Sequence, residues 1–153
     1  MLKKAFNTIK NSSSVESLMD GALAGIKNLT NSGSQYGRSY AAALTLLVAA
    51  DFEFDSREFS AAVHFIQDDT RLREMNLTVE TIEYFQEYTK AIKEVMCQSD
   101  FAFPIVQAKM VEEVRKVPSD YKGHILTMVN TIAQVSGPEE RHIADMIQTA
   151  LLK

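Results

Sequence analysis

Four carboxylates are crowded into the segment Val48–Phe59, whose sequence is VAADFEFDSREF. They are Asp51, Glu53, Asp55 and Glu58. Arg57 is the only basic residue among them. Clustered carboxylate oxygens without histidine or cysteine are the ligands preferred by a hard cation such as Ca²⁺ or Mg²⁺. The segment is therefore a candidate site for a weakly bound divalent cation, with these four acidic residues as its candidate ligands.

Ordinary helix capping would account for part of this cluster. Asp55 can accept hydrogen bonds from the first N–H groups of a helix, and Glu58, three residues later, completes a capping box. Capping uses one or two acids and four are present, so a contact with a cation or a basic partner stays open beside plain capping and a solvated surface. An EF-hand is excluded, because Ser56 replaces the glycine of the calcium loop and Ala62 replaces its last glutamate.

The composition limits the class of protein. The chain has 153 residues, 46% hydrophobic and 24% charged, which is typical of one globular domain. It contains no apolar run of membrane-spanning length. A single cysteine, Cys97, excludes an internal disulfide and favours a cytoplasmic protein. The net charge of −4 argues against a nucleic-acid partner, which would require a basic face.

The N-terminal part differs in charge from the rest. Residues 1–38 contain five basic and two acidic side chains, although the whole chain is acidic. Residues 1–10, MLKKAFNTIK, place Leu2, Phe6 and Ile9 on one side of a helix and lysines mostly on the other. Such a segment fits peripheral contact with an anionic membrane surface, or a terminal helix docked on the body. We therefore divide the chain into a basic arm and helix, 1–35, and a helical domain, 36–153.

Apolar residues recur at helical spacing along almost the whole sequence. Helices are expected over approximately residues 13–29, 40–48, 55–66, 78–96, 104–118, 125–137 and 138–151. A loop is expected over residues 28–37, and a helix end with a solvated loop over residues 67–73. The buried stripe of the longest helix is expected to comprise Val79, Ile82, Phe85, Thr89, Ile92 and Met96. With no alternating strand pattern, the sequence predicts an all-α protein, a compact bundle of about seven helices.

The acidic segment also carries a resemblance. Residues 50–58, ADFEFDSRE, resemble the ADGE-x-D-x-x-E turn that follows an alanine-rich helix in the TerB-like family of tellurite-resistance proteins. Members of this family are all-helical and consist of two pseudo-symmetric halves, each with such a turn. In this chain the sequence of residues 128–147 is similar in pattern to that of residues 44–66. Glu140 aligns with Glu58, at an offset of 82 positions.

The resemblance covers roughly residues 36–152 and implies a non-enzymatic interaction module in tellurite resistance or in linked stress and phage-defence responses. It also implies a protein partner, a TerC-like membrane protein at the inner face of the membrane. Two departures bear on metal binding. Phe52 replaces the usual glycine, and the second turn, SGPEE at residues 136–140, has no aspartate. With half of the family's ligand set, we expect Ca²⁺ or Mg²⁺ binding to be weak or absent.

Two other functions stay open. A small metal-assisted helical enzyme would use Asp51, Glu53 and Asp55 together with His64, and it requires a concave pocket that holds these groups. A phage- or plasmid-encoded modulator of the host resistance or defence machinery would fit the reduced second turn. Cys97 has no flanking catalytic signature, and the chain has no phosphate-binding glycine motif.

Overall fold

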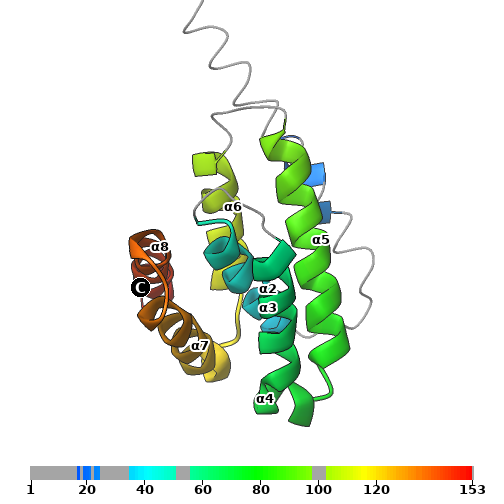
Figure 1. The fold of residues 1–153 in the computed structure, drawn as a ribbon, viewed down its shortest axis with the longest axis vertical. Helices are drawn as coiled ribbons and strands as arrows, with labels where there is room; N and C mark the ends of the chain where they lie inside the picture. The colour runs from blue at the N-terminus through cyan, green and yellow to red at the C-terminus, as the bar shows by residue number, and fades with distance from the viewer. Residues whose placement is uncertain are drawn as a thin grey trace, which may run out of the picture.

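The computed structural model describes residues 17, 19–21, 23–24, 35–50, 56–97 and 103–152. Within these ranges every regular element is helical, which confirms the all-α prediction (Figure 1). The elements are α2 (Gln35–Val48), α3 (Ser56–Asp68), α4 (Thr70–Glu74), α5 (Thr78–Met96), α6 (Phe103–Arg115), the 3-10 helix η1 (Ser119–Tyr121), α7 (Lys122–Gln134) and α8 (Pro138–Leu151). The basic segment 1–10 lies outside the described residues.

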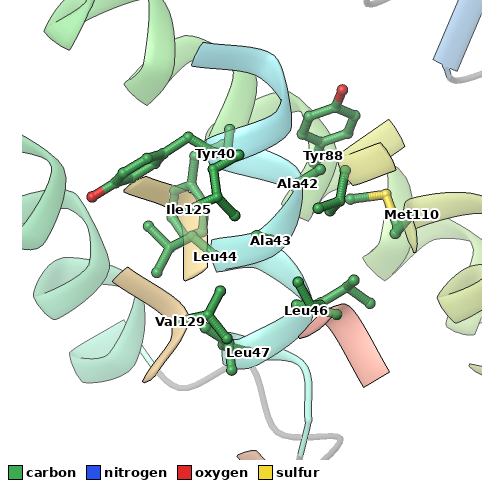
Figure 2. Packing of buried hydrophobic residues seen from close by; sticks show 14 of the residues in the cluster. Tyr40, Ala42, Ala43, Leu44, Leu46, Leu47, Tyr88, Met110, Ile125 and Val129 are labelled. Atoms are coloured by element: carbon green, nitrogen blue, oxygen red, sulfur yellow. The ribbon is translucent and has the colours of Figure 1, made fainter. Parts of the chain in front are cut away.

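Helix α2 is the centre of the molecule. It contacts α5 and α6 as well as α3, α7 and α8, and eleven of its 14 residues are buried (Figure 1). Figure 2 shows Tyr40 and Leu44 with Ile125 and Val129 of α7 on one side, and Met110 of α6 on the opposite side. A helix that is apolar around its whole circumference must be enclosed by other elements. The alanines at positions 41–43, all fully buried, let the neighbouring helices approach its backbone closely.

The enclosed helix also carries polar groups that are paired inside the bundle. The Ser39 hydroxyl donates a hydrogen bond to the backbone carbonyl of Glu113 (3.0 Å). Arg38 Nη2 lies 3.8 Å from Glu113 Oε2, and the Glu113 side chain is only 3% exposed. Burial, and then the negative charge of Glu113, raise the pKa of the neighbouring Tyr88 well above its usual range. Lys116 Nζ also lies 3.5 Å from Glu113 Oε1, so each oxygen of this buried carboxylate has a basic neighbour.

A short helix occupies the place of one expected loop. Asp69 Oδ1 accepts hydrogen bonds from the N–H groups of Arg71 (3.0 Å) and Leu72 (3.1 Å), so that Asp69 is the N-cap of α4. Asp69 Oδ2 accepts a hydrogen bond from the Tyr40 hydroxyl at 2.8 Å, which ties this corner to α2. Leu72 is fully buried. The predicted helix end is confirmed, since α3 ends at Asp68. The predicted solvated loop is wrong, because a capping aspartate and one core leucine stabilise a turn of helix there.

Three other expectations are wrong in detail. Helix α2 begins at Gln35, inside the expected loop 28–37, since the buried Tyr36 ring stacks on Tyr121 with centroids 4.8 Å apart. Val79 is 69% exposed, because α5 turns a different stripe toward α2. Residues of that stripe that the sequence prediction omitted are Thr81, Tyr84, Tyr88, Ala91 and Val95. Helix α7 ends at Gln134, and Gly137 is the N-cap of α8.

Two glycines in helices predict opposite responses to alanine. At Gly123 an added Cβ meets nothing within 4 Å, whereas at Gly37 it would lie 3.0 Å from the buried Thr81 Oγ1. Gly123→Ala is expected to raise the free energy of unfolding by about 0.5–1 kcal/mol, and Gly37→Ala to lower it by about 1 kcal/mol. Urea unfolding measures both, with Thr81→Ala as the background that should relieve the clash. Equal stabilisation by both alanines would contradict the close contact.

The buried tyrosines predict a loss of stability at alkaline pH. Burial raises the pKa of Tyr36 to about 12, and the pKa of Tyr40 is raised by burial and by the Asp69 carboxylate. An unfolded tyrosine ionises near pH 10, so the contribution of Tyr36 is intact below pH 10 and disappears between about pH 10 and 12. Urea unfolding across this window should show falling stability, with a shallower fall in Tyr36→Phe. Ionisation of all tyrosines near pH 10 in the folded protein, read at 295 nm, would contradict this.

Candidate functional site

One of the four predicted ligands lies in the described part of the chain. Glu58 is the third residue of α3, and its side chain is partly buried. Asp51, Glu53 and Asp55 lie outside the described residues. In the described part of the chain, the candidate site therefore comprises Glu58 and the side chains that surround it.

Glu58 lines an open pocket of about 210 Å³ with mostly apolar walls. Leu44, Leu47 and Val48 from the last turns of α2 form part of the lining. Phe65 of α3 and Ile132 of α7 also contribute. Leu44 and Leu47 are themselves part of the buried core, shown in Figure 2. The pocket is thus a gap in side-chain packing between α3 and the α7–α8 pair, with α2 along it.

A second carboxylate lines the same pocket. Glu140 is the third residue of α8, just as Glu58 is the third residue of α3. Both helices therefore present a glutamate from their first turn. The Oε2 atoms of Glu58 and Glu140 are almost inaccessible to solvent, and Oε2 of Glu140 has no hydrogen-bond partner among the described residues. Two acidic side chains thus share one largely apolar environment.

The start of α8 explains how Glu140 reaches this position. Gly137 is the N-cap in an extended conformation, and Pro138 takes the first position, where a missing N–H is not needed. A Cβ at Gly137 would lie 3.2 Å from a carboxylate oxygen of both Glu139 and Glu140. The glycine leaves room for these side chains to fold back over the helix start. Their negative charge is favourable there because of the helix dipole.

Ser136 supplies a third polar group to the pocket. Its hydroxyl donates a hydrogen bond to the Ile132 carbonyl at 2.7 Å, so the remaining capacity of its oxygen is to accept. The lining residues in the described part of the chain include no lysine or arginine. Arg141, next to Glu140 in sequence, lines a different pocket with Asp145. The pocket therefore offers acceptors of hydrogen bonds and negative charge.

The other sequence candidates lie elsewhere. His64 is exposed on α3 and is not among the residues that line the pocket with Glu58. Cys97 is exposed at the end of α5. His142 lines a separate pocket between α6 and α8. In the described ranges, no three His, Cys, Asp or Glu side chains come together as a metal-binding group.

The sequence contained a signal for Glu140 but none for the pocket. The similarity in pattern between residues 44–66 and 128–147 aligned Glu140 with Glu58. The apolar lining comes from three helices, α2, α3 and α7, so it depends on tertiary packing that periodicity alone does not specify. The site residues that sequence reasoning missed are therefore the apolar ones and Ser136.

No family model matches the chain, and the comparisons with curated proteins and with solved structures find no match. The likeness of the acidic turn to the TerB-like family therefore stays a prediction. Among the helices in the described ranges, none has the length and apolar character needed to cross a bilayer.

The shared pocket predicts a difference between two adjacent glutamates of α8. Glu139 is exposed, and Glu139→Gln should cost about 0.3–1 kcal/mol of favourable interaction with the helix dipole. Glu140→Gln loses the same interaction but also removes a charge that has one oxygen shielded from water, so it should be neutral or stabilising by up to about 1 kcal/mol. Urea unfolding at pH 7 and low salt measures both. A larger loss in Glu140→Gln than in Glu139→Gln would contradict this prediction.

Proposed function

We propose that this chain is a non-enzymatic interaction module of the TerB-like kind. Its acidic turn and the adjoining pocket contact a positively charged group, either a divalent cation or the basic surface of a partner protein. The observation that carries the proposal is that Glu58 and Glu140, from the first turns of α3 and α8, line one apolar pocket. A positive group bound in this pocket would have two carboxylates in its lining to offset its charge.

The family assignment rests on the acidic turn and gains support from the equivalence of the two glutamates. Each occupies the third position of its helix, and the two positions are 82 residues apart, as expected for two pseudo-symmetric halves. A role in tellurite resistance, in stress or in phage defence follows from the resemblance, as does a TerC-like membrane partner. We place the protein in the cytoplasm, peripheral to the inner membrane when it binds such a partner.

Interaction is favoured over catalysis by the position of His64. A metal-assisted enzyme would need this imidazole and the acidic side chains at one concave site. His64 is instead exposed on α3, on a part of the helix that does not line the Glu58 pocket. Glu58 and Glu140 alone would give an apolar pocket with two acceptors, which suits the binding of a cationic group.

The proposal is tested by NMR titration of the ¹⁵N-labelled chain with calcium chloride and, separately, with a hexalysine peptide. At least one of the two should produce saturable shifts of the Glu58 and Glu140 amide signals. These shifts should be strongly reduced in the Glu58→Gln/Glu140→Gln variant, because the charges that attract the ligand are gone, and retained in Glu139→Gln. Unchanged Glu58 and Glu140 signals with both reagents at millimolar concentration would overturn the proposed function.

A further inference from the structure

We propose that the pocket between Glu58 and Glu140 is a docking site for a lysine side chain of a partner protein. This inference rests on the proposed function and specifies the positive group that the site accepts. It follows from three properties of the pocket: its apolar walls, its set of hydrogen-bond acceptors, and its size.

The walls match the stem of a lysine. Leu44, Leu47 and Val48 from α2, with Phe65 and Ile132, provide apolar surface in the same pocket as the two carboxylates. A lysine side chain has the same division, since four methylene groups precede a charged tip and commonly lie along apolar surface. The volume of about 210 Å³ is below the range of about 300–1,000 Å³ found for drug-sized ligands. It therefore suits one side chain better than a whole small molecule.

The acceptors match the ammonium group. A lysine ammonium has three N–H donors and no acceptor. The pocket contains the Glu58 and Glu140 carboxylates and the Ser136 oxygen, whose own proton is already donated to the Ile132 carbonyl. The lining thus includes three acceptors from separate segments of the chain for these three donors, and bonds to the two carboxylates would be charge-assisted, which roughly doubles their strength.

Other positive groups fit this arrangement less well. The planar guanidinium of arginine binds best to a single carboxylate through two parallel bonds, whereas these carboxylates come from two different helices. A Ca²⁺ ion takes six to eight oxygen ligands, and Mg²⁺ retains several waters. In this pocket such waters would lie against Leu47, Phe65 and other apolar side chains. The lysine is the cation whose apolar and polar parts both find a counterpart.

The test follows the methyl signals of Leu47 and Ile132 by NMR, at constant ionic strength. The probes are n-butylammonium, n-butylguanidinium, 1-butanol and calcium chloride, all as single titrants. Butylammonium should shift both methyl signals saturably and bind at least about tenfold more tightly than butanol or butylguanidinium. The peptides acetyl-Gly-Lys-Gly-amide and acetyl-Gly-Arg-Gly-amide then test whether a lysine within a polypeptide binds as the free amine does.

Three variants make the test specific to the site. Glu58→Gln/Glu140→Gln should weaken butylammonium binding at least tenfold, the effect of losing one charge-assisted hydrogen bond. Ser136→Ala should weaken it by a smaller factor, and Glu139→Gln should leave it unchanged. Glu58 lies in the first turn of α3, next to the acidic turn, so its substitution also affects the start of that helix. If the double variant fails to fold, Glu140→Gln alone is compared with the wild type.

Several outcomes would overturn the inference. Binding of butylammonium that is equal in wild type and in Glu58→Gln/Glu140→Gln would show that the carboxylates play no part. Binding of butylammonium without binding of the lysine peptide would assign the pocket to a free amine. Shifts with calcium but none with butylammonium would also overturn it, and would leave the proposed function standing with a metal ion as the positive group. Loss of response to every cation would remove both proposals.

Discussion

The enclosure of α2 is the constraint on which the rest of the structure depends. A helix with neighbours on all sides cannot place polar side chains on a solvent face, so each one must be paired inside. Ser39 and Arg38 find their partners on Glu113 of α6, and Tyr40 finds Asp69 at the start of α4. These long-range contacts join segments that are far apart in sequence. They fix the rotation of α2 about its axis and therefore decide which of its residues face each neighbouring helix.

The same constraint produces the pocket. At the end of α2 the neighbouring elements are α3, α7 and α8, whose side chains meet Leu44, Leu47 and Val48. Because α3 and α8 both begin near this end, their first turns bring Glu58 and Glu140 to one place. The chemistry of the site is thus a consequence of where helices start. Glycine and proline at positions 137 and 138 set that start in α8, and the acidic turn precedes it in α3.

The sequence predicted the helices better than their contacts. Thr78, Pro104 and Pro138 marked helix starts to within one residue, because capping and proline chemistry are local. The short helix α4 was missed, since its stability comes from Asp69 and from the burial of Leu72, neither of which periodicity reveals. Val79 was assigned to the wrong face because several stripes of α5 are apolar and tertiary packing selects one of them. The pocket lining could not be predicted at all, since it requires four helices in their final positions.

Capping explains the presence of Glu58 and Glu140 but does not explain their surroundings. A glutamate at the third position of a helix is favourable through the dipole and through contact with the backbone of the N-cap residue. An exposed glutamate, such as Glu139, obtains the dipole benefit while staying hydrated. Glu140 instead holds a carboxylate oxygen out of water near Gly137, at the edge of a mostly apolar pocket and without a hydrogen-bond partner in the described part of the chain. That arrangement costs free energy in the isolated protein. A ligand that supplies both a positive charge and an apolar stem would recover this cost on binding, which is the physical basis on which we propose a recognition role for the pocket.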